Sequence, residues 1–159
     1  MALDPTAREA NFRDSIKKYL VDSLVTASGI YLSFDKSLAT PKIQGHTVNR
    51  WVSVRFGTLS RQVVSDAIVE LRCCTREDNE GFKLAQLTDT VMGYLTPDPS
   101  TTPDGIKRIT FYRSYASPTA WTNIGGLIVF DIIESPEMDA EDETKYKVLT
   151  VRIRFASKV

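Results

Sequence analysis

Two stretches of the chain repeat their apolar residues at steps of three and four, which is the spacing of an amphipathic helix. The first stretch runs from Asp4-Pro5, a capping side chain followed by a proline suited to the first helical position, to Gly29. The second stretch follows the segment 75–80, which supplies caps and first-turn acids. The apolar stripes are Phe12, Ile16, Tyr19, Leu20, Leu24 and Ala27 in the first helix and Leu84, Leu87, Val91, Met92 and Leu95 in the second.

Six further segments predict β-strands, because polar and apolar residues alternate along most of them. They are residues 30–34, 48–56, 66–73, 106–115, 121–134 and 146–155. Residues 57–61 predict a turn that joins the second and third strands into a long antiparallel hairpin. The strand 121–134 is too long to stay straight, so we expect a bulge or bend at Gly125-Gly126. Residues 35–47, 96–105 and the acidic segment 136–144 are expected to form loops.

The order of these elements is helix, three strands, helix, three strands, which indicates the α+β class. We expect a mainly antiparallel (mixed) β-sheet with two helices packed on one face and a long C-terminal hairpin. The chain has 159 residues, the usual length of one domain, so we predict a single domain over residues 1–159.

Charge and composition narrow the possible environments of the protein. The 20 Lys and Arg residues balance 20 Asp and Glu residues, so no long-range field would attract nucleic acid or an anionic membrane. The longest apolar stretch, 124–130, is far shorter than the ~20 residues of a membrane span, and the first eight residues lack the apolar core of a signal peptide. The adjacent Cys73 and Cys74 suit a reducing compartment. We therefore expect a soluble, cytoplasmic protein with no membrane partner.

Few residues of the chain offer chemistry for a reaction. His46, in a predicted loop, is the only histidine, and no metal-binding or phosphate-binding spacing is present. We therefore predict no catalytic, cofactor-binding or metal site. Asp66 and Glu70 share one strand face and could act as an acid–base pair, although two acids on the wet face of a sheet are the more ordinary interpretation.

A second alternative is nucleic-acid binding. Basic residues with interleaved aromatic residues suit phosphate contacts and base stacking on a sheet face. The set is Lys107, Arg108, Tyr112, Arg113, Tyr115, Arg152 and Arg154. Cross-strand pairing with Glu70 or Glu134 would explain the arginines equally well.

The two tryptophans favour a role in assembly. Trp51 is out of phase with Val52 and Val54, which places it on the face opposite the helices, and Trp121 begins a predicted strand. Exposed tryptophan is enriched at the anchor points of protein interfaces, whereas local packing against a loop is the alternative for either residue. Long edge strands also need a cover, which a neighbouring subunit would supply.

The sequence resembles the tail terminator (tail completion) proteins of long-tailed bacteriophages, in particular those of T5-like siphophages. The stretches that carry the resemblance are the opening helix 12–20, the hairpin 51–74, the helix-to-strand passage 90–114 and the terminal strand 148–155. They match the family through the order of their elements, since the family has no short diagnostic motif. Together they cover most of the chain.

This resemblance implies a small α+β subunit without catalytic residues that forms a hexameric ring. The ring would cap the last ring of the tail tube, end its polymerisation and offer the head side a docking surface. The implied partners are further copies of the chain, the tail tube protein and a head completion or neck protein, with the genome passing through the ring without sequence-specific binding. The implied location is the neck end of the virion tail, reached from the host cytoplasm.

Five residues are the candidate contacts with a neighbouring subunit or with the tube: Trp51, Arg55, Trp121, Arg152 and Arg154. A heterologous contact between copies closes into a ring when the rotation per subunit divides a full turn. Two other classes stay open at this point, namely another neck or head–tail connector protein and a nucleic-acid-binding accessory protein.

Overall fold

The computed structural model describes residues 9–34, 42–43, 46–47, 49–113, 121–140 and 143–156. The helical segments are α1 (Glu9–Leu20), the π-helical η1 (Val21–Thr26) and α2 (Phe82–Leu95). The main strands are β1 (Tyr31–Phe34), β4 (Arg50–Ser60), β5 (Val64–Thr75), β6 (Lys107–Arg113), β7 (Thr122–Glu134) and β9 (Lys145–Ala156). Two-residue strands are β2 (Lys42–Ile43), β3 (His46–Thr47) and β8 (Met138–Asp139). The predicted α+β class and the order of helices and main strands are confirmed.

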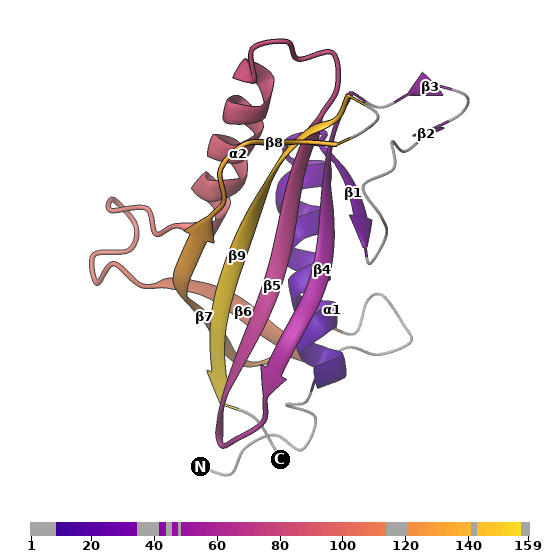
Figure 1. Ribbon diagram of the computed structural model, residues 1–159. Helices are drawn as coiled ribbons and strands as arrows, with labels where there is room; N and C mark the ends of the chain where they lie inside the picture. The colour runs from indigo at the N-terminus through magenta and orange to yellow at the C-terminus, as the bar shows by residue number, and fades with distance from the viewer. Residues whose placement is uncertain are drawn as a thin grey trace.

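One sheet runs through the molecule in the order β1-β4-β5-β9-β7-β6, with β8 added beside β9 (Figure 1). β1 runs parallel to β4, and the other described pairings in this sheet are antiparallel. The central strands β5 and β9 stay in register from Val64 opposite Ala156 to Thr75 opposite Lys145. β7 and β9 form the expected C-terminal hairpin.

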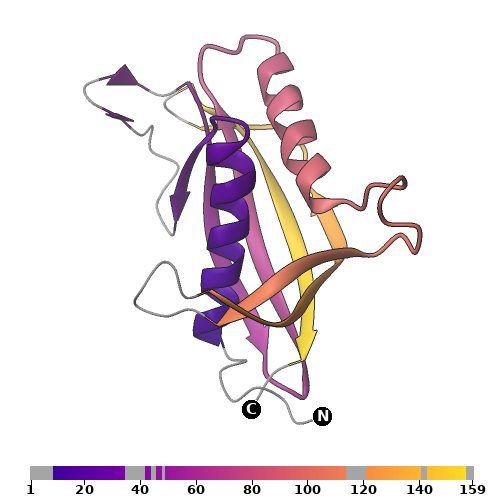
Figure 2. The ribbon, with the colours of Figure 1, turned by 180° about the vertical axis from the view of Figure 1, so that it is seen from behind.

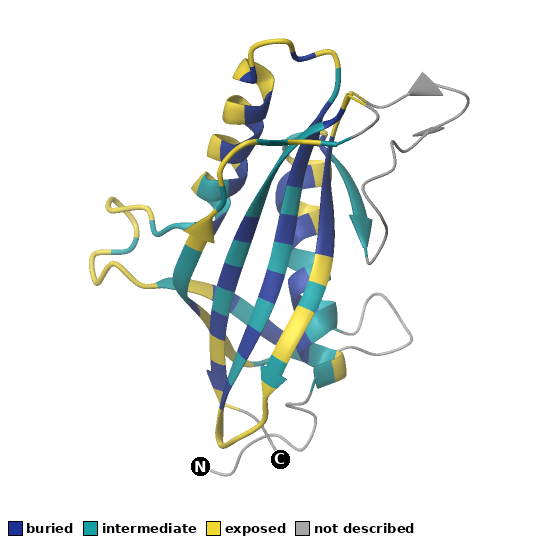
Figure 3. Ribbon diagram, in the orientation of Figure 1, coloured by how far each residue is buried: buried dark blue, intermediate teal, exposed yellow. Residues whose placement is uncertain are grey.

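Both helices cover the same face of the sheet, and Figure 2 shows the molecule from their side. Phe12 of α1 stacks on Phe155 of β9, with ring centroids 4.8 Å apart, and meets Phe56 of β4 edge-on at 6.2 Å. Phe111 of β6 approaches Phe155 from a third direction at 5.4 Å. The dark blue positions that alternate along the middle of β5 and β9 in Figure 3 are inward residues of this core. The predicted alternation is confirmed along β5 and β9.

The first helix ends as the sequence predicts but changes its winding before the end. Gly29 adopts a left-handed φ of +65° and donates its N–H to Val25 O at 3.0 Å. Before it, residues 21–26 widen into the π-helix η1. The wider turn rotates the later side chains away from the stripe, so Ala27 is exposed, contrary to its predicted place in the core. The predicted start at Asp4-Pro5 lies outside the described residues.

Glycine is responsible for one wrong boundary in the prediction. Gly57 does not begin a turn; β4 continues to Ser60 through a bulge between Phe56 and Leu59. A Cβ on Gly57 would lie 3.3 Å from Ile68 O, so the absent side chain lets the bulged strand stay close to β5. The chain reverses only at residues 61–63.

The other bulges and loops follow the prediction in part. β7 is bulged opposite the step from Phe111 to Tyr112, beside Gly125-Gly126 as expected, and again between Val129 and Asp131, which was not expected. The predicted loop 35–47 contains the short pair of β2 and β3, and the predicted loop 136–144 contains β8. Each is too short to carry a periodic signal.

Candidate interaction surface

The face of the sheet turned away from the helices carries no helix (Figure 1). We call it the outer face and define it by residues from β4, β5, β9 and β7 that alternate with the core residues. In cross-strand rows they are Asp66, Arg154 and Ile128; Ile68, Arg152 and Asp131; and Arg55, Glu70, Thr150 and Ile133, with Phe130 between the first two rows. The structure thus brings together three predicted contacts, Arg55, Arg152 and Arg154.

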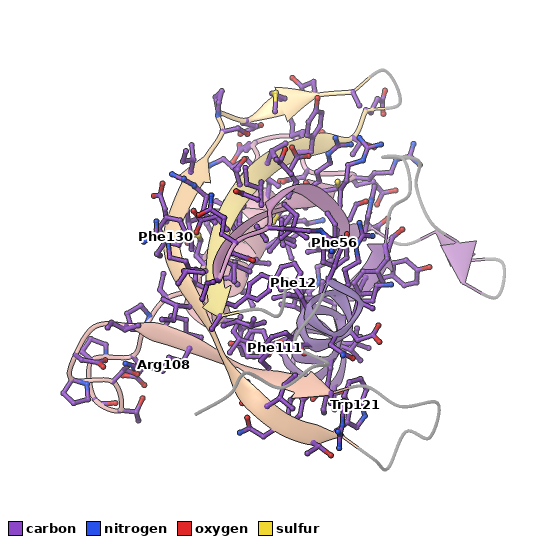
Figure 4. The ribbon with its side chains drawn as sticks, turned by 90° about the horizontal axis from the view of Figure 1, so that it is seen from below. Phe12, Phe56, Arg108, Phe111, Trp121 and Phe130 are labelled. Atoms are coloured by element: carbon purple, nitrogen blue, oxygen red, sulfur yellow. The ribbon has the colours of Figure 1, made fainter. Side chains whose placement is uncertain are left out.

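Phe130 lies at the second bulge of β7. The register between β7 and β9 shifts around it, so Phe130 has no partner residue on β9. The guanidinium carbons of Arg154 and Arg152 lie 4.2 Å and 5.0 Å from its ring centroid. The negative face of an aromatic ring attracts cations at such distances. Figure 4 shows Phe130 on the outside of the curved sheet, away from the phenylalanines of the core.

The same two arginines also have acidic partners. Arg154 Nε donates to Asp66 Oδ1 at 2.8 Å, and Arg152 Nη1 lies 3.8 Å from Asp131 Oδ2. These are half-exposed pairs, so each contributes little to the stability of the isolated subunit. Their effect is geometric, because a guanidinium with both an aromatic and an acidic neighbour is held in one orientation.

Asp66 and Glu70, the two acids that could act as an acid–base pair in an enzyme, do share the outer face. Asp66 is bonded to Arg154, and the Glu70 carboxylate lies 3.6 Å from Arg72 Nη2. Glu70 also lies opposite Arg55 on β4, whose side chain is exposed. This is the arrangement of ion pairs on a solvated sheet face, which was the ordinary interpretation of the two acids.

Apolar side chains complete the outer face. Ile133 is 57% exposed and Ile128 is 38% exposed, both on β7. Combined with Phe130 and the arginines, they give a surface of aliphatic, aromatic and guanidinium groups. That composition is typical of the central parts of protein interfaces, where aromatic residues and arginine are enriched.

Trp121 lies elsewhere, beside α1. Its ring meets Tyr112 of β6 edge-on at 5.8 Å, and Lys18 Nζ of α1 lies 5.6 Å from each of the two ring centroids. Figure 4 shows Trp121 and Phe130 on different sides of the molecule. Trp121 is half-buried, so any contact that it makes belongs to a second surface.

Trp51 is buried, with 1% of its surface exposed, so its prediction as a surface contact is wrong. It occupies the side of β4 opposite the core residues Val52 and Val54, as predicted, and lies opposite Cys74 of β5. Alternation reveals which face a residue occupies but not what covers that face. Its indole N–H has no hydrogen-bond partner among the described residues.

The basic set proposed for nucleic acid is divided between strands. Lys107 Nζ lies 5.3 Å from the Tyr19 ring centroid of α1, and Arg108 pairs with Asp104 at 2.7 Å. The two β9 arginines lie on the outer face instead, and Tyr115 lies outside the described residues. No continuous basic stripe forms from the described members of this set.

An acidic cleft of about 430 Å³ lies at the end of the sheet where β5 leads to α2. Its lining residues are Glu77, Asp78, Asn79, Asp139, Ala140, Glu143 and Lys145. Hydrogen bonds to Asp139 and Glu137, at 3.0 Å and 3.3 Å, raise the pKa of Lys145. The described residues contain no group of three or more His, Cys, Asp or Glu side chains arranged for a metal ion. The side chain of His46 lies outside the described part.

Sequence reasoning missed Phe130 and Ile133 as members of the surface. The stretch 127–133 is apolar except for Asp131, so it carries no alternation from which the faces could be assigned. The bulge moves the core positions from Leu127 and Val129 to Ile132, which reverses the phase of the strand. The signal in the sequence was the length of the predicted strand 121–134, which is too long to stay straight without a bulge.

Comparisons with known proteins find a similar fold but identify no activity. No protein-family model and no curated protein matches the sequence. One solved structure, which carries no functional description, is similar with a TM-score of 0.51 and 9% identity, over 89% of this chain and 94% of the other. At that identity the likeness concerns the fold alone. No helix in the described ranges has the length and apolar character needed to cross a bilayer.

Proposed function

We propose that this chain is a structural subunit of a bacteriophage tail, a terminator protein that forms a ring on the end of the tail tube and ends its growth. The observation that carries the proposal is the outer face, on which Arg152 and Arg154 lie over Phe130 next to the exposed Ile133. A surface of this kind, left uncovered in one chain, fits a contact between proteins. The order of elements that resembles the tail terminators supports the same conclusion.

The mechanism is geometric. Each subunit contacts the next through unlike surfaces, and the contact closes into a ring, hexameric in the resembling family, when the rotation divides a full turn. One side of the ring copies the surface through which a tube subunit joins the tube end. The other side does not copy a tube subunit, so no further subunit adds. That second side is free for a head completion or neck protein, and the genome passes through the ring.

The charges of the outer face suit this role. Arg152 and Arg154 already have acidic neighbours within the subunit, so a partner that covers them does not need to supply a charge for each. Arg55 is exposed and is the arginine of this face most available to an acidic group of a neighbour. Trp121, on the other surface, remains a candidate contact with a different neighbour.

The experiment compares the oligomeric state of the wild-type protein with that of Ile133→Asp, measured by mass photometry and negative-stain electron microscopy. Ile133 is more than half exposed, so the variant should fold, but a carboxylate in an apolar contact should prevent ring formation. The matched control is Thr90→Asp, an exposed position on α2 on the other side of the sheet, which should assemble as the wild type does.

Two results would contradict the proposal. The first is a wild-type protein that forms no ring either alone or on tail tubes, and the second is an Ile133→Asp variant whose rings are indistinguishable from those of the wild type. A ring that binds the head and ignores tail tubes would instead assign the chain to the connectors of the neck.

A further inference from the structure

We infer that the free edge of β6 accepts an extended strand, and that this strand is β1 of a neighbouring copy. The inference rests on the proposed ring and names one of its subunit contacts. Within the described residues β1 and β6 are the two end strands of the sheet, each paired on one side only. The described part of the sheet therefore ends in two unlike strands, and Figure 2 shows the end of β6 against α1.

The hydrogen bonds of Tyr112 show which main-chain groups lie on the open edge of β6. Its N–H donates to the Ser15 hydroxyl of α1 at 2.8 Å, and its carbonyl oxygen lies 3.3 Å from the same hydroxyl. Both groups thus point away from β7. Because these groups change sides at every residue of a strand, those of Thr110 and Arg108 also point away from β7.

Of these three residues, only Tyr112 has its outward main-chain groups paired, by the Ser15 hydroxyl. Among the described residues, no hydrogen bond reaches the main-chain N–H or C=O of Thr110 or Arg108 on the open edge. Two donors and two acceptors at this alternating spacing are the pattern that one further strand satisfies. An extended polypeptide is the ligand that this pattern specifies.

A groove of about 130 Å³ lies beside that edge, between β6 and the helical segments. It is lined by Lys18, Tyr19 and Asp22 from the helical side and by Arg108, Ile109, Thr110 and Tyr112 from β6. Its charges are already paired, since Lys18 Nζ lies 2.8 Å from Asp22 and Arg108 lies 2.7 Å from Asp104. A groove with paired charges favours an uncharged strand over a charged one.

The β1 strand fits that description. Its sequence, Tyr-Leu-Ser-Phe, has no charge and spans 4 residues. The β6 stretch before the Ser15 contact, from Arg108 to Phe111, is equally long. Pairing β1 of one copy with β6 of the next joins unlike edges, so each copy has two neighbours and the contact can close into a ring. Pairing β6 with β6 would give only a two-fold dimer.

The first test removes a main-chain donor without disturbing the fold. Thr110→Pro deletes an N–H that faces away from β7, a position at which edge strands tolerate proline, and its ring obstructs the added strand. We expect the concentration for half-assembly to rise at least about tenfold. Thr110→Val alters the side chain but keeps the N–H, so its half-assembly concentration should stay within about twofold of the wild type. Unchanged melting of both variants checks the fold.

The second test identifies the strand that is added. Ser33→Cys in β1 and Thr110→Cys in β6 are made in separate proteins, mixed, and treated with a bismaleimide. Cys73 and Cys74 are buried, so the new thiols should react first. We expect linked heterodimers from the mixture, and a ladder of multimers when one chain carries both substitutions. Thr90→Cys on α2 replaces either partner as the control and should give no specific product.

The outcomes separate this inference from the proposed function. Rings that form normally from Thr110→Pro, or that give no Ser33–Thr110 product, overturn the β1–β6 contact while the ring itself stands. Efficient linking of Thr110→Cys to itself would show a two-fold contact and also overturn the inference. A wild-type protein that forms no ring, either alone or on tail tubes, contradicts both.

Discussion

Replacing Asp78 by alanine removes the acceptor that holds the start of α2 against the sheet. Its Oδ2 accepts the Leu84 N–H at 2.9 Å and the Thr75 hydroxyl at 3.1 Å, and its Oδ1 accepts the Lys83 N–H at 3.2 Å. Asp78 and Thr75 are both buried, so alanine leaves donors without a partner. The loss of a side chain that accepts N–H groups of the first helical turn costs about 1 kcal/mol, as for a cap, and an unsatisfied buried group costs about 1–3 kcal/mol. We expect a loss of about 3 kcal/mol in unfolding free energy.

This contribution should depend on pH. Burial alone would raise the pKa of the Asp78 carboxyl, but the N–H groups of Leu84 and Lys83 and the Thr75 hydroxyl stabilise the carboxylate, so the pKa is lowered overall. A carboxyl whose pKa is lower in the folded state stabilises the fold above its unfolded pKa, about 3.9. That stability is lost as the pH falls through the folded pKa. The difference between wild type and Asp78→Ala should therefore be largest at neutral pH and shrink in acid.

Thermal unfolding followed by circular dichroism measures both effects. For a chain of this size, about 3 kcal/mol corresponds to a Tm lower by about 6–12 °C. Asp89→Ala, an exposed position on the same helix, is the control and should melt close to the wild type. The reasoning is refuted if Asp78→Ala melts within about a degree of the wild type at neutral pH.

Three further experiments test the packing: one labels the native cysteines, and two replace a buried residue. Burial raises the pKa of Cys73 to about 12, so a thiol reagent at neutral pH should label Cys73 and Cys74 only after denaturation; rapid labelling of the native protein would contradict this. Trp51→Ala should cost about 3–5 kcal/mol in urea unfolding and Trp51→Phe clearly less, because the indole N–H has no described partner to lose; equal costs would refute that explanation. Ser15→Ala leaves the Tyr112 N–H without its acceptor and should cost about 1–2 kcal/mol, against no change if water replaces the hydroxyl.

The sequence predicted the elements that depend on regular periodicity. Leu71 and Val151 could be assigned to the core because their strands alternate without interruption. Gly29 could be assigned to the helix end because few other residues adopt a positive φ there. The residues that depend on a break in periodicity were not predictable. The helical spacing of the apolar residues does not reveal that residues 21–26 widen into a π-helix, and the bulge at Phe130 lies in an almost wholly apolar segment.

The candidate surface was predictable to a similar extent. Arg152 and Arg154 could be placed on one face by alternation, but their shared contact with Phe130 depends on the bulge and hence on tertiary structure. Trp51 shows the opposite error, because its face was predicted correctly and its exposure was not. A residue's face follows from its own strand, whereas its exposure depends on segments distant in sequence.

The central claim is that the protein acts by assembling on the tail tube and not by catalysing a reaction. Its most direct test is electron microscopy of tail tube protein polymerised with and without this chain. We predict tubes that carry one ring at the growing end and whose lengths stop increasing once the chain is added, with Ile133→Asp failing to stop them. Tubes that keep growing with no density at their ends in the presence of the wild-type protein would contradict the proposed function.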